Sequence, residues 1–415
     1  MIEWSESHQL IRDSVRRFVE TEIAPNLEDL EHGDLPPYDI LRKLYATFGI
    51  DEMNGARFDK LIAKARAVEA GTAPSTESGG SSRGGDRGDG VAMQLIPIIE
   101  LCRYCPGMVT AMGVSVGLTG SAVMSKGTLE QKERWGRDLL TLEKVGAWAI
   151  TEPGSGSDAF GGMRSTARRT DEGFILNGSK TFITNGPHAD TIVFICKLEE
   201  DGVDPRDRKL LNFVLDRGMP GLEQTPPLRK MGLHSSPTGE LFVTDLVAGE
   251  DRLLGGLEAL SGGSGRSGAK DTFQTERAGV AAMALGIVER CLELCVAYAR
   301  ERVQFEKPIG EFQLIQEKLA RMEVARLNLQ NLVFRVIECA TAGKGMTLAE
   351  ASAMKLYAAR AAVEVAMEAV QVFGGNGYMS EYRVEQLARD AKVLQIYAGT
   401  DEIQIGAIAR DLLRA

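Results

Sequence analysis

Long helical periods in the last third of the chain constrain its fold more than any other feature. Apolar residues recur at spacings of three and four over the stretches 272–302, 312–341, 347–373 and 381–394. Helices of this length bury their apolar faces most simply against one another. The pattern predicts a four-helix bundle within residues 261–415.

The middle of the chain has a different pattern, because short apolar or alternating runs replace the helical periods. Turn signals such as Asn177-Gly178 and Asn185-Gly186-Pro187 separate these runs, which are 147–150, 174–176, 181–184, 191–196, 210–215 and 241–243. Residues 145–260 are therefore expected to form an antiparallel β-barrel or sandwich.

Helical periods also fill residues 1–144, interrupted by a Gly- and Ser-rich stretch at 71–92. That stretch has almost nothing apolar to bury and is expected to be a mobile surface loop. A second such stretch, 261–270, is expected to be a linker. It superficially resembles a phosphate loop, but Asp271 follows where Ser or Thr would bind magnesium, and no strand precedes it. The predicted fold class is α+β: a helical domain, a β-barrel domain and a helical bundle.

Composition excludes several classes of protein. The net charge is −10 and no basic block occurs, which argues against a general nucleic-acid binder. No run approaches the roughly 18 to 20 apolar residues that cross a bilayer. Residues 1–7 show neither a basic n-region nor an Arg-rich transit pattern, so a cytoplasmic location without membrane contact is expected.

The cysteines are expected to be free, buried thiols, because six in 415 residues do not make a disulfide framework. Cys102 and Cys105 form a CxxC, but a zinc site needs two further ligands, and the four histidines are scattered singly. No metal site is predicted.

The segment WAITEPGSGSD at 148–158 leaves an expected strand and enters a turn of small residues. Such a turn exposes backbone N–H groups and the hydroxyls of Thr151 and Ser157, which suit the carbonyls of a planar cofactor or a phosphate. Taken alone, this pattern is more often only a tight turn. A second segment, NGSKTFITNG at 177–186, favours the interpretation of this turn as a binding site.

Together these two segments resemble the acyl-CoA dehydrogenase family, which has an α-domain, a β-domain and a four-helix α-domain in the order expected here. Three further segments match in the same order: RVQFEKPIG at 302–310 followed by Phe312-Gln313, QVFGGNGY at 371–378, and RDAK at 389–392. The resemblance covers the chain apart from its two Gly-rich stretches.

The resemblance implies FAD as the cofactor. The residues expected around its isoalloxazine ring are Ile150, Thr151, Gly156, Ser157, Phe182 and Thr184. In the family a neighbouring subunit holds the adenine and diphosphate half, which here would involve Arg302, Gln304, Phe305, Gln313, Gln371 and Gly375. Thr400 and Glu402 match the last flavin-contacting positions. A cofactor shared between chains implies a homo-oligomer, and a homotetramer arranged as a dimer of dimers is expected.

The position of the catalytic base is unusual, because the family's usual Tyr-Glu-Gly-Thr segment reads Tyr397-Ala398-Gly399-Thr400 here. Relatives of the isovaleryl-CoA and long-chain type carry Ala there and place their Glu on the first helix of the bundle, where Glu276 matches. Spacing alone puts Glu276 on an apolar stripe with Phe273, Val280, Met283, Ile287 and Cys291. An ordinary ion pair, or a helix-start acid favoured by the dipole, is the alternative.

The resemblance also implies the reaction and its partners. Glu276 would remove the α-proton of an acyl-CoA while the β-hydride passes to flavin N5, which yields a trans-2-enoyl-CoA as in fatty acid β-oxidation. Expected substrate-binding residues are Ser157, Arg277, Tyr397, Ala398, Gly399 and Arg410. The expected electron acceptor is an electron-transferring flavoprotein.

Two positions depart from the family pattern: Phe182 stands where many relatives have Trp, and Glu306 stands where Gly is common. The second places negative charge near the expected diphosphate. Since a fold does not determine a function, two alternatives stay open. One is a flavin-dependent acyl-CoA oxidase or monooxygenase on the same fold, and the other is a non-catalytic partner subunit of a mixed-subunit dehydrogenase.

Overall fold

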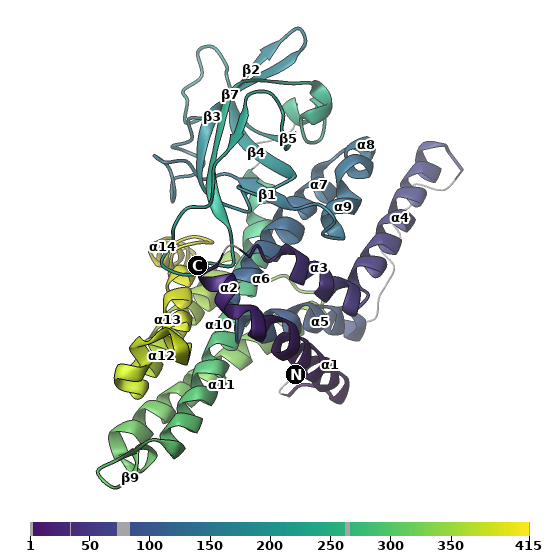
Figure 1. Ribbon diagram of the computed structural model, residues 1–415. Helices are drawn as coiled ribbons and strands as arrows, with labels where there is room; N and C mark the ends of the chain where they lie inside the picture. The colour runs from purple at the N-terminus through teal and green to yellow at the C-terminus, as the bar shows by residue number, and fades with distance from the viewer. Residues whose placement is uncertain (1–2, 34, 73–83, 262–265, 415) are drawn as a thin grey trace.

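Helices, a sheet and helices again follow one another along the chain, as predicted (Figure 1). The computed structural model describes residues 3–33, 35–72, 84–261 and 266–414. In Figure 1 the sheet domain stands at the top, the C-terminal helices run to the lower left, and the N-terminal helices lie between them and to the right.

The N-terminal domain is helical. Its α-helices are α1 (Glu6–Phe18), α2 (Leu27–Glu31), α3 (Tyr38–Thr47), α4 (Ile50–Glu69), α5 (Gly84–Cys102), α6 (Pro106–Met112), α7 (Ser121–Lys126), α8 (Leu129–Gln131) and α9 (Arg137–Leu140). Helix α1 starts at the N-cap Ser5, whose hydroxyl accepts a hydrogen bond from the amide of His8 at 3.2 Å. It buries Val15 and Phe18, as its periodicity predicted.

Part of the Gly-rich stretch at 71–92, which was expected to be a loop, is helical. Residues 73–83 lie outside the described part of the chain, but α5 begins at Gly84, so 84–92 are helical and the loop prediction is wrong there. Helix α5 packs on α10 and α11, and a Cβ on Gly88 would lie 1.9 Å from the Thr341 hydroxyl. Glycine in this stretch therefore permits a close helix contact.

One apolar segment is longer than expected. The helical run Pro106–Lys126 joins α6, a π-helical turn at Gly113–Gly120 and α7, and by length and composition it could cross a membrane. Half of its most apolar stretch is buried in the protein, and the Ser115 hydroxyl accepts a hydrogen bond from the Gly146 amide at 2.8 Å. A core helix of a protein has the same properties, so this segment is weak evidence for membrane contact.

The middle domain is a mixed, curled sheet of seven strands within the described residues. The strands are β1 (Gly146–Ala149), β2 (Thr166–Thr170), β3 (Gly173–Thr184), β4 (Thr191–Leu198), β5 (Leu210–Asp216), β6 (Leu222–Gln224) and β7 (Thr238–Ala248). Their order is β1-β4-β2-β3-β7-β6, with β5 paired to β4. The antiparallel prediction holds for most pairs but is wrong for β1–β4 and β2–β4, which are parallel.

Asn177-Gly178 is not the turn that its residue types predicted. Both residues lie inside β3, where the register against β7 shifts between Leu176 and Gly178. A Cβ on Gly178 would lie 2.1 Å from the Ser165 hydroxyl oxygen, so glycine serves a β-bulge here. The second turn signal is confirmed, because β3 ends at Thr184 and a turn follows.

The C-terminal helices are α10 (Arg266–Glu301), α11 (Gln313–Thr341), α12 (Leu348–Phe373) and α13 (Val384–Lys392), which confirms the predicted bundle, and α14 (Asp401–Leu412), which was not predicted. Residues 262–265 lie outside the described residues. Residues 266–270 already belong to α10, so the linker prediction is wrong for them. One glycine costs only about 1 kcal/mol within a helix of this length, and α10 tolerates Gly268.

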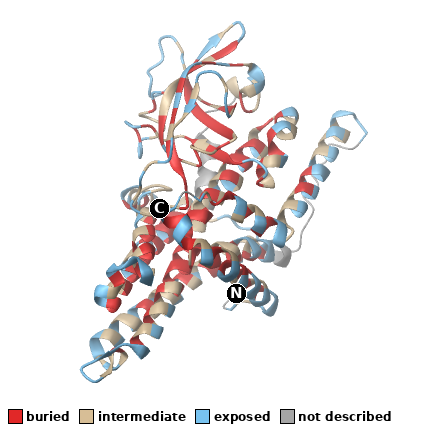
Figure 2. Cartoon of the chain, in the orientation of Figure 1, coloured by how far each residue is buried: buried red, intermediate tan, exposed pale blue. Residues whose placement is uncertain are grey.

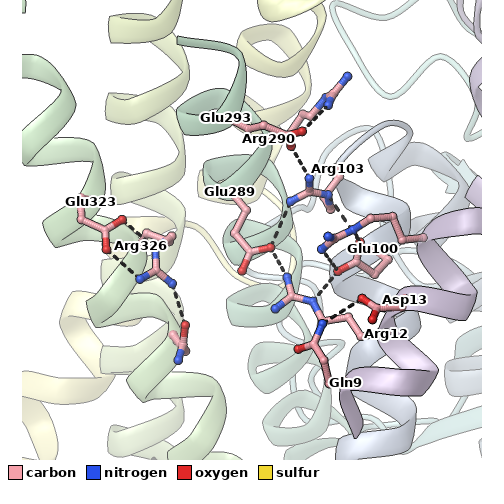
Figure 3. A network of polar contacts seen from close by, with 12 residues as sticks. Gln9, Arg12, Asp13, Glu100, Arg103, Glu289, Arg290, Glu293, Glu323 and Arg326 are labelled. Carbon is pink, nitrogen blue, oxygen red and sulfur yellow. Dashed lines mark hydrogen bonds and ion pairs between the residues drawn. The ribbon is translucent and has the colours of Figure 1, made fainter. Parts of the chain in front are cut away.

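Buried residues concentrate where α10 and α12 face each other and on the inner face of the sheet (Figure 2). A buried ion-pair network joins the N-terminal helices to the bundle (Figure 3). Glu100 of α5 is fully buried and pairs with Arg12 and with Arg16 of α1, the latter at 2.9 Å, while Arg12 also pairs with Glu289 of α10. These guanidinium groups outweigh the effect of burial and hold the pKa of Glu100 below its usual range.

Candidate active site

Glu276 lies near the start of α10 and faces the interior. The residues that share its stripe, Val280, Met283, Ile287 and Cys291, are all buried, as predicted; the side chain of Phe273 lies outside the described part. Glu276 itself is half-buried. Burial raises the pKa of its carboxyl to about 7, and the cations of Arg277 and Lys355 oppose that rise. A carboxylate that titrates near neutrality is suited to general-base chemistry.

Two cations border Glu276, and both are buried. Arg277 is 6% exposed and donates to the Ser352 hydroxyl at 3.0 Å, while its Nε has no hydrogen-bond partner among the described residues. Lys355 of α12 is fully buried, and its ammonium donates to the Gly399 carbonyl at 2.8 Å. Burial lowers the pKa of Lys355 to about 8, although Asp401, 3.9 Å away, opposes that change.

The Tyr397-Ala398-Gly399 segment forms a turn beside these groups. Ala398 and Gly399 both have left-handed backbones, with φ of +54° and +87°. The Gln404 amide donates to the carbonyls of both residues, at 3.0 and 2.9 Å. A Cβ on Gly399 would lie 3.7 Å from an Arg277 nitrogen, so this turn and the start of α10 meet. The structure thus brings Glu276, Arg277, Ala398 and Gly399 together.

The turn after β1 in the β-domain contains further residues expected in the site. The carbonyl of Ile150, just after β1, accepts a hydrogen bond from Lys180 at 3.2 Å, and that of Thr151 accepts one from the Thr181 amide at 3.0 Å. Lys180 is fully buried and pairs with the buried Glu152 at 2.9 Å. Although burial raises the pKa of Glu152, Lys180 and neighbouring hydrogen bonds hold it below its usual range. The turn after β1 is therefore tied to β3.

Phe182 lies in β3 at a point where the strand is irregular. The register against β7 shifts between Lys180 and Ile183, and Phe182 has a φ of +57°. Its ring is 68% exposed although its neighbours Thr181 and Ile183 are buried. Bulges re-aim side chains in this way, and an exposed ring beside the Ile150–Thr151 turn is a surface on which a planar ring can stack. Thr184 is half-buried, whereas Gly156 and Ser157 are exposed.

The residues expected at the adenine and diphosphate half lie at the opposite end of the bundle. Arg302, Gln304 and Phe305 belong to the hairpin of β8 (Val303–Gln304) and β9 (Lys307–Pro308), at the lower left tip in Figure 1. The end of α12 joins this tip, because the Phe373 ring stacks on Tyr298 of α10 with centroids 4.1 Å apart. The remaining expected residues, Gln313, Gln371 and Gly375, are exposed, as are the three in the hairpin.

This tip cannot serve the Glu276 region of the same chain. Helix α10 continues from Glu276 to Glu301, which corresponds to roughly 38 Å at 1.5 Å per residue. The structure therefore separates the predicted cofactor residues into two groups that do not meet within one chain.

Three further expected residues lie on α14 or at its start. Thr400 caps the helix by accepting from the Ile403 amide at 3.4 Å, and Glu402 is exposed in the first turn. Arg410 is exposed in the last turn, about 14 Å farther along the helix than Asp401. The structure does not bring Arg410 to Glu276. Tyr397 is closer, because its hydroxyl reaches the sulfur of the buried Met283 at 3.3 Å.

Sequence reasoning missed Lys355, Gln404 and the Lys180–Glu152 pair. A signal for Lys355 exists, since it falls on the same helical stripe as the buried Ala351, Ala358 and Ala362. A lysine on an alanine stripe needs a buried partner. Gln404 and Glu152 have no comparable signal, because their partners are backbone groups or distant in sequence.

Metal and disulfide chemistry do not compete for this region in the part of the chain described. No group of three or more His, Cys, Asp or Glu side chains there could hold a metal ion. The six cysteines are free and buried, as predicted.

The donor set fits FAD in two separate parts. Near β1 and β3, backbone groups held by Lys180 and the exposed Phe182 ring suit a flat, hydrogen-bonding ring system. At the far tip, the exposed side chains of Arg302, Gln304 and Gln371 offer the charge and hydrogen-bond donors that a diphosphate needs.

Family models match almost the whole chain. Residues 5–143, 147–246 and 263–413 match the N-terminal, middle and C-terminal domains of acyl-CoA dehydrogenase, respectively. The resemblance seen in the sequence motifs is therefore confirmed over all three regions.

Individual relatives agree. The chain is 36% identical over 398 residues to the short-chain-specific acyl-CoA dehydrogenase of Megasphaera elsdenii, covering 96% of this chain and 95% of that protein. The structure of butyryl-CoA dehydrogenase from Megasphaera elsdenii aligns over 100% of both chains with a TM-score of 0.82 and 32% identity. A glutaryl-CoA dehydrogenase from Mycobacterium smegmatis in complex with FADH2 aligns over 99% of this chain and 96% of its own with a TM-score of 0.82 and 25% identity. The chain therefore belongs to the acyl-CoA dehydrogenase family, as an FAD-dependent oxidoreductase that acts on acyl-CoA thioesters.

Proposed function

We propose that the chain oxidises a saturated acyl-CoA to its trans-2-enoyl-CoA, with Glu276 as the base. The observation that carries this proposal is the half-buried Glu276 carboxyl with a pKa of about 7, beside the Ala398 turn. The α-proton of a thioester is weakly acidic, so its removal needs both a positioned carboxylate and a donor for the enolate-like oxygen. Glu276 supplies the first, and the backbone of Ala398 supplies the second without needing a side chain.

In this reaction the α C–H bond breaks toward a Glu276 oxygen, and its electron pair forms the new carbon–carbon double bond. FAD, when bound, accepts the β-hydrogen with its electron pair. Ile150, Thr151, Phe182 and Thr184 would hold the ring of the cofactor, and the exposed Ser157 would contact both cofactor and substrate. Arg277 positions the acyl-CoA and, as a cation, favours the ionised form of Glu276.

The predicted substrate contact Arg410 is exposed and lies in the last turn of α14, at the other end of that helix from Thr400. It can meet only the outer part of the CoA moiety. Tyr397 and Gly399 line the inner part, because they flank Ala398 in the turn.

The active form is a homo-oligomer in which a second copy supplies Arg302, Gln304, Phe305, Gln313, Gln371 and Gly375. The separation of the two groups of cofactor residues along α10 supports this. A groove of about 700 Å³ between the outer faces of α11 and α12 offers a contact surface. Val324 and Met367 on these helices are 58% and 56% exposed, so a partner copy could bury two large apolar side chains there. A dimer or a tetramer fits these observations.

The test is an anaerobic titration of the purified protein with short, branched, long and steroid-side-chain acyl-CoAs, followed by the visible absorption of the flavin. Bleaching by one class, with a matching 2-enoyl-CoA product, supports the proposal and identifies the substrate. Rapid reoxidation by oxygen would favour the oxidase alternative instead of an electron-transferring flavoprotein as acceptor. A protein that binds no flavin would favour the non-catalytic partner subunit.

Glu276→Gln tests the base directly. The variant should keep FAD and lose at least ~10²-fold in turnover, which is the usual contribution of a general base. Glu301→Gln, in the exposed last turn of α10, is the matched control and should behave as wild type. Near-wild-type turnover of Glu276→Gln would remove Glu276 from its role.

A further inference from the structure

Lys355 is a buried cation that the reaction as described so far does not use. It lies in α12 between Ala351 and Ala358, and none of its surface is exposed. An ammonium group in such surroundings is strongly disfavoured unless it is paired and hydrogen-bonded. Its partners therefore indicate why it is there.

The strongest partner of Lys355 is a backbone carbonyl of the Ala398–Gly399 turn. Its ammonium donates to the Gly399 oxygen at 2.8 Å, while its distance to the Asp401 carboxylate is 3.9 Å. Asp401 is closer to Arg360, at 3.0 Å. The main contact of Lys355 is therefore its hydrogen bond to the turn, and its ion pair with Asp401 is the longer contact.

Gln404 holds the same turn from α14. Its amide nitrogen donates to the Ala398 carbonyl at 3.0 Å and to the Gly399 carbonyl at 2.9 Å, and the side chain is fully buried. Two buried donors from two helices therefore converge on two consecutive carbonyls. We call Lys355 and Gln404 the carbonyl clamp.

The turn needs such a restraint. Ala398 has a φ of +54°, in the left-handed region that a residue with a Cβ enters only at a cost, and Gly399 follows at +87°. Among the described residues, the amide N–H of Ala398 donates no hydrogen bond. The clamp fixes the carbonyl side of this strained turn and leaves the Ala398 N–H unused by the protein.

We propose that Lys355 is a positioning residue of the active site, which together with Gln404 holds the Ala398–Gly399 turn so that the Ala398 amide can donate to the thioester oxygen of the substrate. This inference rests on the proposed function. The positive charge of Lys355 has a second effect, because the charged groups near it are Glu276 and Arg277 of α10 and Asp401 and Glu402 of α14. Together with Arg277 it lowers the pKa of Glu276 against the effect of burial.

The test compares Lys355→Met and Gln404→Met with the exposed control Lys344→Met. The probe is the acyl-CoA of the panel that reduces the wild-type flavin fastest. Two rates are followed against pH: turnover, and exchange of the α-proton of the probe with solvent D2O, which mass spectrometry detects. Exchange reports carbonyl polarisation and the base without hydride transfer. Bound flavin and thermal unfolding are measured for every variant.

Lys355→Met is expected to keep its flavin, to lose ~10²-fold in exchange and turnover because the donor is misplaced, and to need a higher pH than wild type for half-maximal rate. Gln404→Met removes a donor but no charge, so it should lose rate without moving the pH midpoint. A structural role alone would not separate the two variants in this way.

If either folded variant exchanged the α-proton at the wild-type rate, the proposed positioning role of the carbonyl clamp would be wrong. If Lys355→Met does not fold, Gln404→Met still decides the question by its rate and its unchanged midpoint. Failure of the proposed function is distinguishable, because then the wild-type protein itself would neither exchange the α-proton nor bleach, or Glu276→Gln would keep the wild-type exchange rate.

Discussion

The two ends of the C-terminal bundle are built differently, although α10 and α12 form both. At the first end, charged side chains are buried: Arg277, Lys355 and Asp401 are 6%, 0% and 7% exposed, and burial raises the pKa of Glu276 to about 7. At the second end, Arg302, Gln304, Gln371 and Phe305 are exposed, Phe305 to 87%.

This difference indicates at which end of the bundle a single chain provides all the partners of its polar groups. Burying charge costs free energy that only precise partners offset, so the first end has its partners within the chain. The second end exposes polar groups and an aromatic ring, as a surface that binds another molecule does. The cofactor site should therefore be composite, with one end from each of two copies.

The largest expected effect comes from mixing two impaired variants. Arg302→Ala should weaken FAD binding up to ~10²-fold, since hydrogen bonds to charged groups contribute about 1.5–3 kcal/mol each, and Glu276→Gln lacks the base. In a mixed pair, one site has Glu276 from the first variant and Arg302 from the second. Coexpression should restore turnover to about a quarter of wild type, because roughly half of randomly assembled pairs are mixed and each has one intact site.

A matched control separates complementation from simple stabilisation. Arg302→Ala coexpressed with the double variant Glu276→Gln/Arg302→Ala can form no intact site and should show no more turnover than Arg302→Ala alone. Arg300→Ala, an exposed neighbour in the last turn of α10, should bind FAD as wild type does. Mixed assemblies that form but regain no activity would show that both ends of a site belong to one chain.

The next effect is the pH dependence at the buried end. Glu276 must be ionised to act as a base, so kcat/KM should fall about tenfold per pH unit below its pKa of about 7 and level off above it. The same shift has a consequence for stability. Because the folded pKa lies above the value of about 4.3 expected in the unfolded chain, the protonated carboxyl favours the folded state, and this contribution is lost as pH rises from about 4.3 through about 7.

Glu276→Gln removes both effects, which thermal unfolding between pH 4 and pH 8 can check. The variant should gain stability relative to wild type as pH rises through this window, and the difference should disappear at its acid end. Glu301→Gln at the exposed end should follow wild type throughout. A wild-type rate profile flat between pH 5.5 and pH 8 would contradict the assignment of Glu276.

Periodicity predicted the long helices because their apolar faces pack within the chain. It failed where local pattern and packing disagree. Residues 84–92 and 266–270 read as loop because of their glycines, yet α5 and α10 include them, and Gly88 is what permits α5 to approach Thr341. Strand β6 buries none of its residues fully and β2 buries only Ala167, so neither had an apolar run to detect.

The candidate site divides in the same way. Spacing alone put Glu276 on an apolar stripe but did not separate a base from an ion-paired or helix-start acid, so the assignment as base came from the resemblance to a family. Lys355 on its alanine stripe is a similar exception to an apolar pattern. The far-end residues have no such signal. Arg302 and Gln371 are exposed, so only the resemblance to a family singled them out. No pattern in one chain predicts which surface a second copy will cover.

The smallest expected effect concerns Glu306, beside Phe305 in the exposed hairpin. Both turn residues have left-handed backbones, Phe305 with φ of +51° and Glu306 with φ of +67°. A two-residue turn of this kind favours glycine, and a residue with a Cβ costs roughly 1 kcal/mol there. Glu306 also adds negative charge near the expected diphosphate. Glu306→Gln and Glu306→Gly should therefore both tighten FAD binding several-fold by removing the charge, and Glu306→Gly should in addition stabilise the hairpin.

Salt distinguishes the two contributions, because it screens charge between exposed groups but leaves backbone strain unchanged. The gain in FAD affinity of either variant, measured as the Kd for FAD, should vanish in high salt, whereas the gain in thermal stability of Glu306→Gly should persist. Glu311→Gln, also exposed but outside the turn, serves as the control. If Glu306→Gln instead weakens FAD binding at all salt concentrations, Glu306 accepts a hydrogen bond from the cofactor, and the far end is then more specialised than an exposed set of donors.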